Sequence, residues 1–404
     1  MIGLKKKTSV TNQANRSVSD RTVTVLSSMS SIVIGLLIGF VFLFIIEIIK
    51  KDPDLTNPFY GMGSLLTSGF SSLSSIVDLL YRAAPLLMVG LAVGFAFKAG
   101  LFNIGATGQY TVGGFFSLVA AILWQFPWWA SILIGMIAGA FWGLIPGIFK
   151  ALFNINEVIT TIMLNWSGLY FVNLIFYNSP NIYLTSERTK PLNLANPSAI
   201  LPDLFGLRES MGYSYANIGI IIAIIFAVII FVILEKTVFG FEIKACGQNK
   251  NASQYAGIKA KRTIIFTMII SGALAGVGGA IQFLSGTVQF TMSSTSLLPM
   301  GFNGIPVALL AFSNPLGTII TSLFISFLQV GGESMQPAYS TEMVNVILAV
   351  IIYFSAFSLI ISHFIRKRLS KKEDVERLDD STPPDEKPND QPTLPNPNKE
   401  EANS

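Results

Sequence analysis

Long apolar runs alternate with shorter polar segments along most of this chain. A helix needs about 20 apolar residues to cross the hydrocarbon core of a bilayer, and there it must satisfy its own backbone hydrogen bonds. Runs of this kind lie near residues 29–49, 83–99, 104–123, 128–149, 158–177, 216–234, 263–285, 297–312, 316–332 and 343–363. The pattern predicts an all-α, polytopic integral membrane protein, a bundle of about ten transmembrane helices.

The basic residues indicate how these spans are oriented, because Lys and Arg accumulate in cytoplasmic loops. With the N-terminus inside, only six of the 27 Lys and Arg fall in outer segments. Both ends of the chain are basic, so both termini are predicted to be cytoplasmic and the number of spans to be even. Eight spans fit this rule as well as ten. The predicted parts are a cytoplasmic tail, a membrane domain and a disordered cytoplasmic tail, at residues 1–28, 29–365 and 366–404.

Three longer polar segments interrupt the membrane domain. Residues 50–82 and 178–215 are predicted to be extracytoplasmic, and the first contains a candidate amphipathic or re-entrant piece, Phe59–Leu80. Residues 235–262 form the long internal cytoplasmic loop.

Part of this cytoplasmic loop has the features of a short helix. Asn249 is a suitable N-cap, and Gly257 stands where a helix ending at Ala256 would need a left-handed residue. Such a helix would present Ala252 and Tyr255 to a cytoplasmic partner. An ordinary basic loop accounts for the same residues, so the spacing alone leaves both interpretations open.

Composition and charge exclude several function classes. Of the 404 residues 51% are hydrophobic and only 12% are charged, against about 25% in a soluble domain. One cysteine, Cys246, and one histidine, His363, build neither a disulfide nor a zinc site nor a His-based triad. The phosphate-binding loop of nucleotide-driven pumps contains a Gly-Lys dipeptide, and this chain has none, so ATP hydrolysis by that route is excluded for the chain on its own.

The spans themselves hold few charges. Glu47 is expected to reach the interface at a span end, and Asp78 has the i,i+4 spacing to pair with Arg82. A carrier coupled to an ion gradient usually places ionisable groups within its spans, so this alternative is weakened. The interpretations that remain are a passive pore and a subunit driven by a separate ATPase.

Glycines at four-residue spacing, such as Gly135/Gly139 and Gly272/Gly276, predict close helix packing.

Four blocks carry a resemblance to a known family. They are Gly240 with Lys244–Asn249, Ala252 and Gly257-Ile258; Gly100–Gln109; Asn156–Asn165; and Gly331–Gln336. They resemble the permeases of ATP-binding-cassette importers for simple sugars, nucleosides and branched-chain amino acids, and the last two resemble the nucleoside-type subgroup. Lys244 replaces the usual Arg, Ser253 the usual second Ala, and Thr107 stands where a carboxylate is frequent. The likeness runs from about residue 80 to 360 in the same order.

The resemblance implies a non-enzymatic permease subunit that moves nucleosides across a bacterial plasma membrane by alternating access. Ribose-like simple sugars are the rival substrates. Implied partners are a cytoplasmic ATPase that binds the ATP, a second and different permease, an extracytoplasmic substrate-binding lipoprotein and membrane lipid. No cofactor or metal of its own, and no nucleic acid, is expected. The residues implied in coupling to the ATPase are Gly247, Asn249, Ala252, Tyr255 and Gly257.

Six residues are candidates for the translocation pathway: Asn103, Gly105, Gly108, Gln109, Glu157 and Asn165. Amide side chains offer donors and acceptors to a polar solute. The first four equally fit a tight turn, in which Asn103 caps a helix. Glu157 fits an inner gate or a helix start in which Asn154 completes a capping box. Asn165 fits a pathway or a helix–helix hydrogen bond.

Several aromatic residues have the chemistry to stack on a nucleobase, but packing against lipid or protein is the expected role of any single one, because the chain has 31 Phe. They are Phe97, Phe102, Tyr110, Trp166 and Phe283.

Overall fold

The structure is a computed structural model. It describes residues 3–50, 52–185, 187–208, 212, 215–292, 296–336, 338–355, 357 and 360–363. The predicted disordered tail, 366–404, lies outside the described residues.

Helices dominate the described part of the chain. The longer ones are α1 (Gly3–Ile49), α2 (Asn57–Thr67), α3 (Leu73–Lys98), α4 (Ala106–Ile122), α5 (Trp128–Phe153), α6 (Glu157–Tyr177), α9 (Gly219–Lys236), α10 (Val238–Gln248), α12 (Ala260–Phe283), α13 (Met300–Leu310), α14 (Pro315–Glu333) and α15 (Thr341–Ser355). Shorter elements are η1 (Ser68–Phe70), β1 (Tyr183–Thr185), β2 (Arg188–Thr189), α7 (Leu192–Ala195), η2 (Pro197–Ala199) and α11 (Lys250–Tyr255). The two strands pair antiparallel.

The predicted polytopic helical fold is confirmed. Each of the ten predicted runs coincides with a helix in the described residues. Seven of these helices are long and apolar enough to cross a bilayer alone, while α4, α13 and α15 are shorter.

Two predicted boundaries differ from the structure. Residues 3–28, expected to form a separate tail, continue α1 as helix. The polar segment expected to reach residue 82 ends at Ser72, where α3 begins, and it contains α2. Ser72 caps α3 by accepting a hydrogen bond from the Ser75 amide. The helix tolerates Asp78 and Arg82 because these two side chains form an ion pair.

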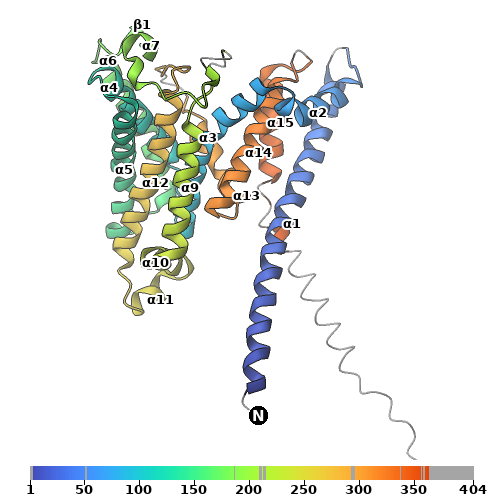
Figure 1. Ribbon diagram of the computed structural model, residues 1–404, viewed down its shortest axis with the longest axis vertical. Helices are drawn as coiled ribbons and strands as arrows, with labels where there is room; N and C mark the ends of the chain where they lie inside the picture. The colour runs from blue at the N-terminus through green and yellow to red at the C-terminus, as the bar shows by residue number, and fades with distance from the viewer. Residues whose placement is uncertain are drawn as a thin grey trace, which may run out of the picture.

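Helix α3 lies between two groups of helices (Figure 1). On one side it contacts α9 and α12, and α12 in turn packs on α4 and α5. On the other side it contacts α13 and α14, while α1 packs on α15. Helices α10 and α11 lie at the lower end of the view, and α2 and α7 at the upper end. Residues of both groups, together with Arg82 of α3, line one cavity.

Glycines allow α5 and α12 to pack backbone to backbone. A Cβ atom on Gly276 would meet the carbonyl oxygen of Gly135 and lie 3.1 Å from the Cα of Gly139. A Cβ on Gly139 would meet the Gly272 carbonyl oxygen. This geometry confirms the predicted packing role of the small residues.

Glu47 organises the corner between α1 and α2. Its buried carboxylate accepts hydrogen bonds from Lys50 Nζ at 2.6 Å, the Asp54 amide at 3.1 Å and Asn57 Nδ2 at 3.0 Å. Lys50 Nζ also donates to the Ala338 carbonyl oxygen at 2.9 Å. Glu47 lies at a span end as the sequence predicts, two residues before α1 ends, and these donors satisfy its carboxylate inside the protein.

We expect the substitution Glu47→Ala to destabilise the protein by about 3 kcal/mol, because it leaves the Lys50 ammonium without its buried partner. Thermal unfolding of the detergent-solubilised protein should show a lower Tm than the wild type. Asp52→Ala removes an exposed carboxylate from the same corner and is the control. Equal Tm values for the two variants would contradict the structural role given to Glu47.

Candidate functional site

The short helix predicted in the cytoplasmic loop is present as α11. Asn249 is its N-cap, with Oδ1 accepting a hydrogen bond from the Ala252 amide at 3.0 Å. Gly257 follows the helix with φ +86, the left-handed conformation that favours glycine. Ala252 and Gly257 are exposed, and 94% of the Tyr255 side chain is accessible. The segment thus forms a projecting knob with an aromatic tip.

Gly247 joins this knob to the turn between α3 and α4. A Cβ on Gly247 would meet the Lys98 carbonyl oxygen and would lie 3.0 Å from the Gly100 nitrogen. Gly100 has φ +70, and a Cβ there would lie 3.2 Å from the Gly247 Cα. The end of α10 and the 98–100 turn are therefore in direct backbone contact.

The same turn leads into a buried polar cluster. Asn103 Nδ2 donates to Gln109 Oε1 at 2.9 Å and to Ser271 Oγ at 2.8 Å. Asn103 Oδ1 accepts a hydrogen bond from the Gly105 amide at 3.0 Å. Ser271 Oγ donates to the Ala92 carbonyl oxygen. These hydrogen bonds join α3, α4 and α12 at the point where the chain enters α4.

Asn165 of α6 completes this cluster. Its Oδ1 accepts a hydrogen bond from the Gly108 amide at 2.8 Å, and its Nδ2 donates to the Ile104 carbonyl oxygen at 3.1 Å. A Cβ on Gly108 would lie 2.9 Å from the Asn165 Cα, so glycine allows α4 and α6 to approach this closely. Asn165 therefore makes the helix–helix hydrogen bonds considered from the sequence.

Glu157 lies apart from this cluster, at the first residue of α6. It forms an ion pair with Lys150 of α5, at 2.7 Å. The residue that caps α6 is Asn156, which accepts a hydrogen bond from the Val158 amide at 2.8 Å. The proposed capping box with Asn154 is wrong, because Asn154 has φ 52 and ends α5 instead.

A cavity of about 410 Å³ opens between the two groups of helices. Its size falls in the range of small-molecule sites. Carboxamide side chains make up much of its polar lining: Gln282, Gln289, Asn303, Gln329, Gln336 and Asn345. Tyr110 and Phe283 supply aromatic surface. The only charged residues among its described lining are Arg82 and Glu333.

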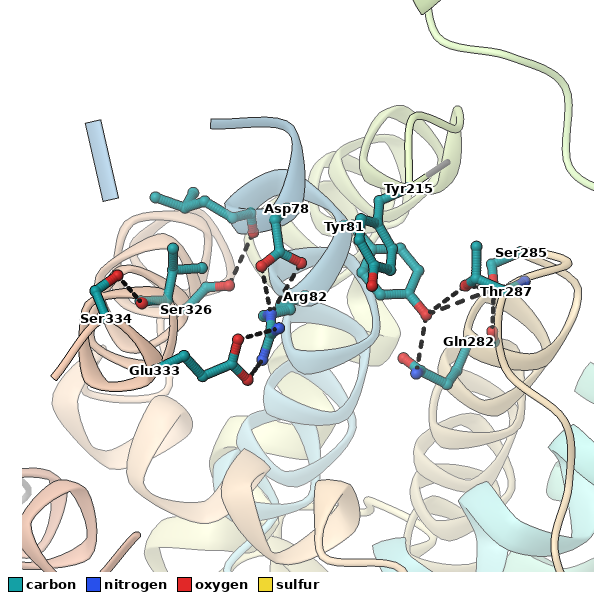
Figure 2. A network of polar contacts seen from close by, with 12 residues as sticks. Asp78, Tyr81, Arg82, Tyr215, Gln282, Ser285, Thr287, Ser326, Glu333 and Ser334 are labelled. Atoms are coloured by element: carbon teal, nitrogen blue, oxygen red, sulfur yellow. Dashed lines mark hydrogen bonds and ion pairs between the residues drawn. The ribbon is translucent and has the colours of Figure 1, made fainter. Parts of the chain in front are cut away.

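Arg82 is held between two carboxylates, as Figure 2 shows. Its Nε donates to Asp78 at 3.0 Å, and its two terminal nitrogens donate to Glu333 at 2.7 and 2.8 Å. Such a bidentate pair has well-defined geometry. It connects α3 with the end of α14, and the three charged groups together carry one net negative charge.

On the other side of α3, Gln282 belongs to a network of polar side chains (Figure 2). Its Nε2 donates to Tyr81 Oη at 3.2 Å, and Tyr81 Oη lies 3.1 Å from Thr287 Oγ1. Gln282 Oε1 is buried and has no hydrogen-bond partner. Buried polar atoms are normally hydrogen-bonded, so this oxygen is an exception in the network.

The structure brings together five of the six predicted pathway residues, Glu157 excepted. None of the six lines the 410 Å³ cavity, so their role in translocation stays a prediction. The cavity's carboxamides were missed as a group, although polar side chains within apolar runs were the available signal. Of the five aromatic candidates, Tyr110 and Phe283 line the cavity, whereas Phe97 and Phe102 stack on each other at 5.1 Å.

The fold and this cavity define a polytopic helical membrane protein with a polar-lined cavity. The signature of a family described as "Branched-chain amino acid transport system / permease component" matches residues 75–356. The chain belongs to this family. It is therefore a multi-pass plasma-membrane transport subunit rather than an enzyme, and the family implies ATPase and substrate-binding partners. Membership favours the ATPase-driven subunit over an ion-coupled carrier or a passive pore.

Individual relatives are similar over most of their length. The nucleoside ABC transporter permease protein NupB of Lactococcus lactis is 38% identical over 86% of this chain and 95% of its own. The guanosine ABC transporter permease protein NupP of Bacillus subtilis is 36% identical over 77% of this chain and 89% of its own length. The glucose ABC transporter permease protein TsgB13 of Haloferax volcanii is 30% identical over 77% of this chain and 82% of its own length. NupC, a further nucleoside permease protein of the same Lactococcus strain, is 26% identical over 64% of this chain and 83% of its own length. No solved structure matches the chain significantly.

Proposed function

We propose that this chain is the permease subunit of an ATP-driven importer that moves nucleosides across the plasma membrane. The observation that carries the proposal is the similarity to NupB and NupP, which extends over most of both chains. The cavity is consistent with such a solute, since carboxamides bond both to hydroxyl groups and to base edges, and aromatic walls accommodate a planar ring.

Energy enters through the exposed knob at α11. A cytoplasmic ATPase binds and hydrolyses ATP, and it docks around Tyr255, Ala252 and Gly257. Supporting this role, α10 contacts the 98–100 turn, so motion of the knob is passed to the packed helices. The solute site then alternates between the two sides of the membrane.

The remaining partners are a substrate-binding lipoprotein and a second permease of different sequence. Two matched permease proteins in one bacterium, NupB and NupC, support a pair of unlike permeases. This chain resembles NupB more than NupC, and therefore takes the NupB position in such a pair.

Uptake of labelled uridine and guanosine by cells with and without the chain tests this function. We expect uptake to require the chain, to stop when ATP is depleted, to survive a protonophore and to be unaffected by excess ribose or glucose. The similarity to TsgB13 makes a simple sugar the second candidate. Sugar uptake that needs the chain, without nucleoside uptake, would select that candidate. Uptake lost to the protonophore while ATP is maintained would contradict coupling to an ATPase.

A further inference from the structure

The charges around the cavity determine what it can bind. Arg82 is the only cation among its described lining residues, and Asp78 and Glu333 both hydrogen-bond to it. The positive charge is therefore more than balanced locally. Moving a phosphate group from water into a site with net negative charge is costly, because its charge would find no free cation. An uncharged solute meets no such penalty.

The neutral part of the lining favours a solute that is rich in hydrogen-bonding groups. Each carboxamide offers two N–H donors and one oxygen acceptor. Gln282, Asn303, Gln329 and Asn345 line the cavity from four different helices. Hydroxyl groups of a sugar and the edge of a base supply the complementary donors and acceptors.

We propose that this cavity is the solute site of the permease and that the Arg82–Glu333 ion pair makes it selective for nucleosides over nucleoside phosphates. The inference rests on the proposed nucleoside transport and adds its site and its selectivity. Glu333 acts by occupying the guanidinium that would otherwise attract a phosphate. Asn303 and Gln329 bind the solute directly.

The test uses the purified complex of the permeases with their ATPase, without the binding protein, and measures equilibrium binding of labelled guanosine and labelled GMP. We expect the wild type to prefer guanosine. Asn303→Ala and Gln329→Ala should each weaken guanosine binding by about tenfold, the effect of one lost hydrogen bond. Glu333→Gln should strengthen GMP binding by about tenfold or more, because the net charge of the cluster rises from minus one to zero and the terminal nitrogens of Arg82 lose their carboxylate partner while Asp78 keeps its own. Asn193→Ala removes an exposed amide outside the cavity and should change nothing.

Three results would overturn the proposal: wild-type transport of guanosine without binding to this complex, unchanged guanosine binding by both amide variants, or unchanged GMP binding by Glu333→Gln. Gel filtration of each variant complex shows that it is folded and assembled. Uptake by wild-type cells separates this inference from the proposed function. If the wild type takes up no nucleoside, the function fails. If it does and the cavity variants behave as wild type, only the site assignment fails.

Discussion

Replacing Gly276 by leucine is expected to prevent this protein from folding stably. The Cβ of any larger residue would meet the Gly135 carbonyl oxygen on α5, and the Gly139 Cα lies only 3.1 Å away. Backbone atoms have no rotamer by which to move aside, so α5 and α12 must separate. We expect a loss of more than about 3 kcal/mol, at or above the upper end for overpacking a core. Fluorescence-detected size-exclusion chromatography should show little monodisperse protein.

Gly63→Leu is the matched control for this substitution. Gly63 is also a helical glycine, in α2, but a Cβ there would meet nothing within 4 Å. Leucine has the higher helix propensity, so this variant should be as stable as the wild type or slightly more stable. A Gly276→Leu protein with the wild-type yield and Tm would contradict the close packing of α5 on α12.

Much of this fold was predictable because the membrane imposes a simple length and polarity rule on its helices. Each of the ten predicted runs overlaps a helix in the described residues, and the glycine spacing correctly indicated tight packing. The start of α3 was placed ten residues too late, because Asp78 and Arg82 made the segment look like a loop. Their ion pair forms only within the helix, and Glu333 from a distant part of the chain completes it.

The candidate site was less predictable, for a physical reason. The α11 cap and its glycine follow from local spacing, and both were found from the sequence. Asn103 and Asn165 were singled out individually, but that both hydrogen-bond to the segment 104–109 depends on how α6 packs on α4. The cavity unites Arg82, Gln282 and Asn345 from α3, α12 and α15. The sequence pattern of a single helix does not show which residues of other helices share a cavity with it, so the cavity becomes visible only in the packed bundle.

The substitution Gly247→Val is expected to uncouple ATP hydrolysis from transport while leaving the ATPase bound. The added side chain would collide with the Lys98 carbonyl oxygen and force the end of α10 away from the Gly100 turn. That turn leads directly to Asn103 and its hydrogen bonds with Gln109 and Ser271. The knob at α11 is not itself altered. Nucleoside uptake should therefore fall by about tenfold or more, as for loss of a coupling energy of 1–2 kcal/mol.

A comparison with Ala252→Glu separates transmission from docking. Ala252 is exposed on the knob, so a carboxylate there should reduce co-purification of the ATPase and abolish uptake for that reason. Gly247→Val should retain the ATPase and its hydrolytic activity but lose uptake. Its Tm should fall, because the clash is with backbone atoms, while gel filtration should still show an assembled complex. Gly63→Val controls for adding a branched side chain to an exposed helix. If Gly247→Val transports normally, motion of the α11 knob does not reach the bundle through the Gly247–Gly100 contact. If it instead loses the ATPase, Gly247 belongs to the docking surface, and the force must enter the membrane helices elsewhere.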